Sequence, residues 1–520
     1  MKKALYLFAF LFLFSNISLT VTSAQDTDEI VEQFVQEATE NSHLEELGHY
    51  LMDVIGPRLV GTPQMQHAHD WAVEKFENWG IEARNEQFGE WRGWERGITH
   101  VDLVSPRVVT LEAMQLAWSP PTPDGGVTAE LVIIPDVGNS EEFEEWLPNV
   151  EGKFVMISMH QPTGRPDYNW EEFATEESFE RMKAKRERME RNWQQRIINA
   201  GHTNRTLPAA LEEAGAAGII MSNWSQAFGT NKIFGANTEN IPVIDILLED
   251  YGMLFRMVKS GHNPEIRVRA ESRELGAVPT YNTIAEIPGT EKPDEYVILS
   301  AHFDSWDGGT GATDNGTGSI TMMEVARILQ KYYPDPKRTI LVGLWGSEEQ
   351  GLNGSRAFVE DNPDVVEGLQ ALFNQDNGTG RVVNISGQGF LHAYEYLTRW
   401  LAAVPEDVRR HIETNFPGMP SGGGTDHASF VAAGAPGFSL FSLHWDYWNY
   451  TWHTNRDTYD KLVFDDLRNN VILIATLAYM ASEDPEFFDR EKRVMPAHPQ
   501  TGHQRSWPQP RSPNRSGGLN

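Results

Sequence analysis

Short apolar, β-prone runs alternate with helical segments over the second half of the chain, and this alternation limits the fold more than any other sequence feature. The runs are residues 282–287, 296–300, 339–345, 371–375 and 438–443. A helical pattern over 465–480 closes the series. Strands that alternate with helices are typical of a largely parallel sheet covered by helices on both faces. We therefore predict the α/β class, with a mixed, largely parallel sheet.

Ionisable side chains come directly after the strand 296–300. His302 and Asp304 lie just past its carboxyl end, and Asp314 follows a glycine-rich turn at the start of the next helical pattern. Ligands of open α/β sheets bind at this edge. A His-x-Asp pair alone is more often a hydrogen-bonded loop than a metal site. A metal site therefore needs further ligands from other strands.

Later parts of the chain supply such groups. Glu348 and Glu349 follow one strand, Asp376 follows the next, and His453 lies in a loop after an aromatic cluster. Two imidazoles and three carboxylates without a thiolate suit catalytic zinc. Five ligands exceed the needs of one zinc ion but match two ions that share a carboxylate, about 3.5–4 Å apart. Of two adjacent glutamates, one can bind metal while the other acts as general base.

The order of these motifs resembles the co-catalytic zinc aminopeptidases of the bacterial leucine aminopeptidase type. The motifs are HxD at 302–304, DNG at 314–316, GSEEQGLNGS at 346–355, NQD at 374–376 and WHTxxDT at 452–458. The resemblance covers about residues 280–485 and 26–115. It implies the zinc-peptidase fold, two Zn²⁺ ions and a peptide or dipeptide substrate.

The resemblance also implies a role for each site residue. Asp314 would bridge the two zinc ions. Glu349 and His453 would complete one metal site, and His302 and Asp376 the other. Glu348 would be the general base, and Asp304 would orient the imidazole of His302.

Further stretches, 302–307, 425–430 and 434–438, are most similar to the carboxypeptidase Q branch of this family, which implies dipeptidase-like homodimers. The run 214–220 looks like the core of a protease-associated domain, a frequent insertion in the family. Other residues near the motifs either line a specificity pocket or only pack and hydrogen-bond, and both interpretations stay open. These are Asp426, His427, Trp445, Tyr447, Trp448, Tyr450 and Trp452.

Composition suggests how the chain is divided. Lys2 and Lys3, an apolar run and the small residues 22–24 predict a signal peptide over 1–24. An exported chain without cysteine fits a bacterial periplasm or medium. The expected parts are a catalytic domain at 25–119 and 276–485, an inserted β-rich protease-associated domain at 120–275, and a Pro-, Arg- and Ser-rich mobile tail at 486–520.

Charge excludes some partners. The formal net charge of −31 opposes binding to nucleic acid and to anionic membranes. No run after the signal peptide is long and apolar enough to span a membrane. The basic helix 171–199 is either a docking surface or a solvated helix with pairs such as Glu187–Arg191, and the second interpretation is favoured.

The predicted function is that of an exported, zinc-dependent exopeptidase. Glu348 would take a proton from a water that bridges the metals, and the hydroxide would attack the scissile carbonyl. An aminopeptidase or dipeptidase is favoured, and a carboxypeptidase with the same centre is the alternative. A glutaminyl cyclase or a non-catalytic binding protein on the same scaffold fits less well, because all five ligands are present.

Overall fold

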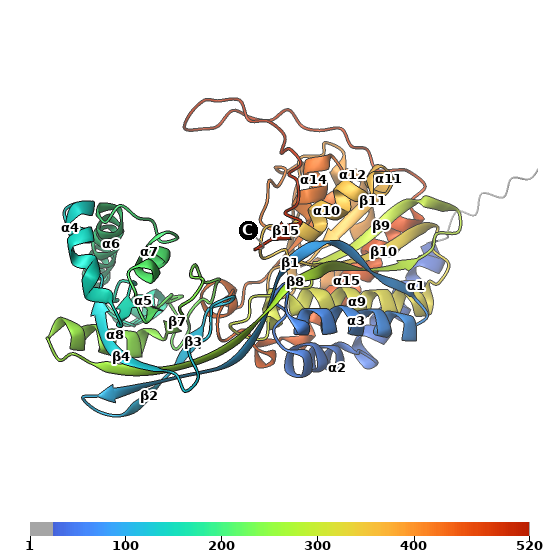
Figure 1. Cartoon of the computed structure of the whole chain (residues 1–520). Coiled ribbons are helices and arrows are strands. Elements are labelled where there is room, and N and C mark those ends of the chain that lie inside the picture. The colour runs from blue at the N-terminus through green and yellow to red at the C-terminus, as the bar shows by residue number, and fades with distance from the viewer. Residues whose placement is uncertain (1–23, 519–520) are drawn as a thin grey trace, which may run out of the picture.

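The structure, a computed structural model, describes residues 24–518, which form a catalytic lobe and an inserted lobe joined by a long β-ribbon (Figure 1). The ribbon pairs β1 (Glu82–Ser105) antiparallel with β8 (Glu265–Ile287). The sequence predicts shorter strands at 81–88 and 101–109 in this region. β-Bulges near Gly89 and Gly93 interrupt the side-chain alternation without ending β1, which explains the difference.

Parallel strands form the centre of the catalytic lobe. They are β9 (Lys292–His302), β10 (Arg338–Trp345), β11 (Leu369–Asn374) and β14 (Gly437–Ser442), in the spatial order β14-β11-β9-β10. β8 pairs antiparallel with β10 at one side. At the other side β12 (Val382–Ser386) pairs antiparallel with β14, and β13 (Glu413–Asn415) lies beyond it. The predicted mixed, largely parallel sheet is confirmed.

Helices cover both faces of this sheet, because side chains along each strand alternate between two cores. Val297 and Leu299 belong to the larger core, and Ile298, between them, belongs to the smaller one. The larger core is covered by α1 (Ala24–Glu40), α2 (Leu44–His49), α3 (Pro63–Asn78), α9 (Thr317–Tyr332), α12 (Ala393–Ala402) and α15 (Phe464–Glu483). The smaller core is covered by α10 (Asn353–Asp361), α11 (Pro363–Glu367) and α14 (His427–Ala433).

The inserted lobe has a separate hydrophobic core. Its strands are β3 (Ala113–Gln115), β4 (Val127–Ile133), β5 (Phe154–Met156), β6 (Gly218–Met221) and β7 (Val243–Ile246). Its helices are α4 (Ser140–Trp146), α5 (Asp167–Phe173), α6 (Glu176–Asn199), α7 (Leu207–Glu213) and α8 (Leu248–Lys259). This core already contains Val101 and Leu103 of β1, although the sequence boundary is drawn at 120. The composition changes only after the chain has entered the lobe, which explains the later boundary.

The basic helix α6 carries the ion pairs expected of a solvated helix. Glu187 and Arg191 approach to 3.5 Å, and Arg181 lies 2.6 Å from Glu177. Its apolar side packs inward through Trp193.

The two ends of the chain differ in what the structure describes. The predicted signal peptide lies, except for Ala24, outside the described residues. Within 24–518, no helix combines the length and hydropathy needed to cross a membrane. The sequence predicts a mobile tail from 486; in the structure parts of this segment contact the catalytic lobe, and its middle projects away from the lobe (Figure 1). Trp507 packs on Phe390 and donates a 2.8 Å hydrogen bond to the Val431 carbonyl, and β15 (Ser516–Gly517) pairs with β1.

Candidate metal centre

The sheet brings the predicted ligands to one edge. His302 ends β9, Glu349 follows β10 and Asp376 follows β11. Because these strands are adjacent and parallel, their carboxyl ends lie together. Asp314 comes from the short helix η3 (Ala312–Gly316), and His453 from the loop after η4 (Tyr447–Thr451).

Asp314 lies between two histidines. Its Oδ1 is 3.3 Å from Nε2 of His302, and its Oδ2 is 3.2 Å from Nε2 of His453. His302 Nε2 also lies 3.1 Å from Asp376 Oδ1, and His453 Nε2 lies 2.9 Å from Glu349 Oε2. Within the described chain these side chains form two metal-compatible groups that share Asp314.

The donor set fits divalent metal ions. All five side chains are largely or fully buried, and carboxylates outnumber imidazoles. Oε1 of Glu349 is buried without a hydrogen-bond partner among residues 24–518, although a buried carboxylate oxygen normally has one. A cavity of about 10 Å³ lies against Asp314, Glu349 and His453. Buried, uncompensated negative charge is costly unless a cation neutralises it.

The carboxylates of this cluster raise the pKa of both histidines. Burial alone would lower the pKa of His453, but Glu349 and Asp314 raise it to about 9. Burial likewise opposes protonation of His302, yet Asp376 and Glu348 raise its pKa well above the usual value.

Asp304 contacts both His302 and the turn that carries the two glutamates. The backbone carbonyl of Asp304 lies 3.0 Å from Nδ1 of His302, whereas its nearest carboxylate oxygen is 3.7 Å away. The carboxylate instead accepts hydrogen bonds from the backbone N–H groups of Glu348, at 3.0 Å, and Glu349, at 3.2 Å. Asp304 therefore holds the turn that carries both glutamates.

Asp457 holds the bridging residue in a similar way. Its carboxylate accepts hydrogen bonds from the backbone N–H groups of Thr313, at 2.7 Å, and Asp314, at 3.1 Å. Burial raises its pKa to about 7. The sequence places Asp457 in the WHTxxDT motif but assigns it no role. An aspartate in the same motif as the proposed ligand His453 could have been recognised as a candidate site residue.

Arg58 is fully buried beneath the centre and was also missed. It donates hydrogen bonds to the backbone carbonyls of Phe303 (2.7 Å), Thr310 (2.8 Å) and Gly311 (2.8 Å). It therefore fixes the loop between His302 and Asp314. Its position in a Gly/Pro-rich segment gave no signal, because an arginine there is usually exposed.

The inserted lobe reaches the metal centre through the residues 231–234. The N–H of Ile233 donates a 2.9 Å hydrogen bond to the His453 carbonyl. The ring of Phe234 lies 5.4 Å from that of His453, edge to face. His453 has a left-handed backbone, with φ of 60°, which is rare outside glycine and needs such support.

The residues whose role the sequence left open lie in different surroundings. Asp426 and His427 are buried, and burial raises the pKa of Asp426 to about 7 and lowers that of His427 to about 4. Tyr447 is buried, whereas Trp445 and Trp448 are exposed. The two exposed rings are therefore available for contacts outside the core.

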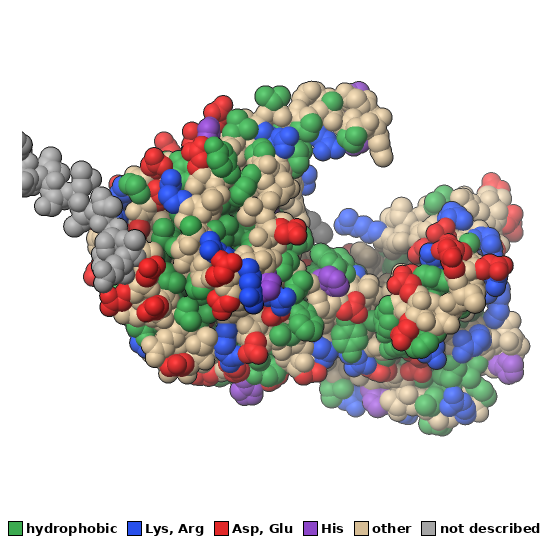
Figure 2. All heavy atoms as spheres, turned by 180° about the vertical axis from the view of Figure 1, so that it is seen from behind, with side chains coloured by type: hydrophobic (Ala, Val, Ile, Leu, Met, Phe, Trp, Pro, Cys, Tyr) green, Lys and Arg blue, Asp and Glu red, His purple; other side chains and the backbone are tan. Residues whose placement is uncertain are grey.

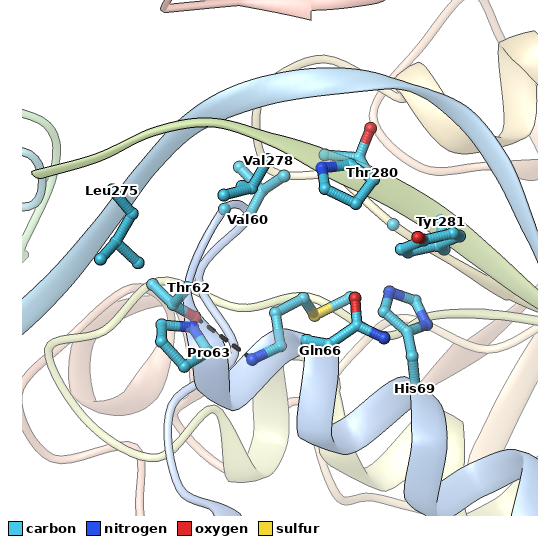
Figure 3. Close-up of a pocket in the computed structure, with 13 residues that line it drawn as sticks. Val60, Thr62, Pro63, Gln66, His69, Leu275, Val278, Thr280 and Tyr281 are labelled. Carbon is cyan, nitrogen blue, oxygen red and sulfur yellow. Dashed lines mark hydrogen bonds between the residues drawn. The ribbon is translucent and has the colours of Figure 1, made fainter.

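A separate cavity of about 220 Å³ lies between α3 and β8 (Figure 3). Its polar contacts are structural: Thr62 caps α3 by accepting a hydrogen bond from the Met65 N–H. Of the described residues that line it, His69 is the only one of a metal-binding type. His69 lies 2.8 Å from the Thr283 hydroxyl, and burial lowers its pKa to about 3. The cavity therefore does not resemble a metal centre.

Known proteins resemble this chain in sequence. Residues 282–478 match peptidase family M28. Carboxypeptidase Q of Mus musculus is 27% identical over 457 residues, which cover 87% of this chain and 88% of the relative. Human carboxypeptidase Q is 25% identical, with 92% and 93% covered.

Solved structures give the same result for the fold. A peptidase M28 precursor from Shewanella amazonensis superposes with a TM-score of 0.66 at 25% identity, covering 92% of this chain and all of the other. BSAP, a zinc aminopeptidase from Bacillus subtilis, superposes with a TM-score of 0.56 at 19% identity, covering 86% and 97%. Residues 282–478 thus match peptidase family M28, the chain over most of its length is similar to carboxypeptidase Q, and these findings support a metallo-exopeptidase.

Proposed function

We propose that the protein is an exported zinc exopeptidase with two metal ions, which hydrolyses the peptide bond next to a free terminus of dipeptides or short peptides. The observation that carries this proposal is the position of Asp314, with one carboxylate oxygen toward each histidine. His302 and Asp376 would hold one ion, Glu349 and His453 the other, and Asp314 both. Such ions, when bound, polarise a carbonyl oxygen and lower the pKa of water.

Glu348 is the proposed general base. Its side chain belongs to neither ligand group, yet it adjoins the ligand Glu349 and is half-buried near His302 and Asp376. The hydrogen bond from its backbone N–H to Asp304 fixes the turn that carries it. Glu348 would accept a proton from the attacking water and deliver it to the nitrogen of the leaving amine. Asp304 would act through this turn, as a positioning residue.

The comparisons support an exopeptidase but leave the preferred terminus open. One relative is named a carboxypeptidase and one similar fold is described as a zinc aminopeptidase. We favour an aminopeptidase or dipeptidase, with a carboxypeptidase as the second candidate. A panel of unblocked, N-blocked and C-blocked dipeptides distinguishes them. Cleavage that tolerates a C-terminal block but not an N-terminal one establishes aminopeptidase action.

Metal removal tests the proposal directly. Chelation should abolish peptide hydrolysis, and added zinc should restore it. Glu348→Gln should keep both metals and lose turnover, while Glu367→Gln, an exposed control on α11, should behave as wild type. An enzyme insensitive to chelators, or a Glu348→Gln variant near the wild-type rate, would refute the assignment.

A further inference from the structure

The cavity between α3 and β8 lies beside the β1–β8 ribbon, which connects the two lobes across the hollow seen between them in Figure 2 (Figure 3). It measures about 220 Å³ and is lined mainly by apolar side chains, among them Val60, Met65, Leu275 and Val278. An apolar cavity of roughly 150 Å³ is already large enough to bind benzene. This cavity can therefore hold a molecule with one or two fused rings.

A chain of hydrogen bonds fixes the position of the proton on the imidazole of His69. The side-chain nitrogen of Asn85 donates to the Asp70 carboxylate at 3.1 Å, so the side-chain oxygen of Asn85 is left as an acceptor. The Thr283 hydroxyl donates to that oxygen at 2.8 Å. Because a hydroxyl has only one proton to donate, the Thr283 oxygen accepts from Nδ1 of His69, 2.8 Å away. His69 therefore carries its proton on Nδ1.

Nε2 of His69 is consequently a hydrogen-bond acceptor. Burial lowers the pKa of His69 to about 3, so the ring is neutral near pH 7 and Nε2 keeps its lone pair. His69 is only 2% exposed, and no group of residues 24–518 donates a hydrogen bond to its Nε2. In Figure 3 the ring of His69 points from α3 toward β8, into the cavity. Buried acceptors normally have a donor, and a bound molecule could supply it.

Gln66 provides a second acceptor beside His69. Its side-chain nitrogen donates a 2.9 Å hydrogen bond to the Asp70 carboxylate, which leaves the side-chain oxygen to accept. Figure 3 shows the amide of Gln66 next to the ring of His69. Both side chains at this end of the cavity therefore offer acceptors. The burial that keeps His69 uncharged also disfavours a charged occupant.

The cavity adjoins the metal centre without including any of its proposed ligands. Gly346, which lines the cavity, comes two residues before Glu348. The ring of His69 lies 5.5 Å from that of Phe303, the residue after His302. An occupant of the cavity would therefore lie beside the backbone that carries the centre, and away from the place where a peptide bond would be cleaved.

We infer that this cavity is a second binding site, for a small uncharged molecule that combines an apolar ring with an N–H or O–H donor, and that this donor hydrogen-bonds to Nε2 of His69. The ring lies against the apolar side chains of α3 and β8. The inference does not depend on the proposed peptidase function, because the site uses none of the proposed metal ligands.

Calorimetric titration of the full chain with indole and with 1-methylindole tests the site. The two molecules share the same ring system, but only indole has an N–H donor. Indole should bind to wild type about threefold to tenfold more tightly than 1-methylindole, as expected for one hydrogen bond. His69→Phe keeps an aromatic ring but removes the acceptor, so this variant should bind both molecules equally. Absence of indole binding to wild type, or the same preference for indole in His69→Phe, would overturn the inference.

A variant that fills the cavity gives a test that leaves His69 in place. The side chain of Val278 lines the cavity, so Val278→Phe should lose at least tenfold in affinity for both indole and 1-methylindole. Val54→Phe, the same substitution at an exposed position outside the cavity, is the matched control and should bind as wild type does. Unchanged indole binding to Val278→Phe would place the bound molecule elsewhere and refute the site.

Discussion

Asn231 of the inserted lobe and Asn455 of the catalytic lobe hold each other through reciprocal hydrogen bonds. The N–H of Asn231 donates to Oδ1 of Asn455 at 3.0 Å, and the N–H of Asn455 donates to the carbonyl of Asn231 at 3.1 Å. Asn455 lies two residues after the proposed ligand His453. The inserted lobe therefore contributes to the position of a ligand that it does not itself carry.

This relationship predicts that Asn455→Ala weakens metal binding at the His453 site. The variant removes one hydrogen bond and leaves the N–H of Asn231 without an acceptor. Zinc affinity should fall about tenfold to a hundredfold, as for other residues that support metal ligands. Competition with a chromogenic chelator measures this. Asn449→Ala, an exposed position in η4 just before this loop, is the control. Unchanged zinc affinity of Asn455→Ala would show that the lobe contact is irrelevant to the ligand.

Asp457→Asn should destabilise the protein even without metal. Asn can offer only one oxygen to the N–H groups of Thr313 and Asp314, so one buried donor loses its acceptor. The expected cost is about 1–3 kcal/mol. Urea unfolding of the chelator-treated protein measures it, and Asp465→Asn, at an exposed position, is the control. Identical unfolding curves for Asp457→Asn and wild type would contradict the structural role of Asp457.

Glu37 should make stability depend on pH in the acid range. Burial opposes its ionisation, but hydrogen bonds from Lys331, Arg327 and Tyr332 lower its pKa from 4.5 to about 2. Because the pKa is lower in the folded state, this stabilisation is present above about pH 4.5 and is lost as the pH falls toward 2. At neutral pH it amounts to about 3 kcal/mol.

Unfolding of Glu37→Gln measures this contribution. The difference in stability from wild type should be large at pH 7 and shrink between pH 4.5 and 2. Glu32→Gln, exposed on the same helix, should show no such difference. If Glu37→Gln is less stable than wild type by the same amount down to pH 2, the lowered pKa of Glu37 is contradicted.

The strands of the largely parallel sheet and the proposed ligands could be predicted from the sequence, because local patterns encode both. Each apolar run that ends in a polar motif, such as the one before His302, predicts a strand end in an α/β sheet. The supporting contacts were not accessible in this way. Arg58 and Asn231 act through backbone groups distant in the chain, and such partners leave no local pattern.

Composition alone does not predict which residues of the C-terminal segment contact the catalytic lobe. Its Pro-, Arg- and Ser-rich composition predicts mobility, which depends on average hydrophobicity. Single side chains of the segment nevertheless contact the catalytic lobe, such as Trp507, which packs against Phe390. Composition averages over the segment and therefore misses such an anchor.

The metal content of Asp314 variants tests the central claim most directly. Elemental analysis of the wild type should find two zinc ions per chain. Asp376→Ala should retain about one zinc ion per chain, because Asp376 would be a ligand of only one of the two ions. Asp314→Ala should lose both, because it alone would contact both ions. A wild type with one zinc, or an Asp314→Ala variant that keeps one tightly bound zinc, would contradict the shared two-metal centre.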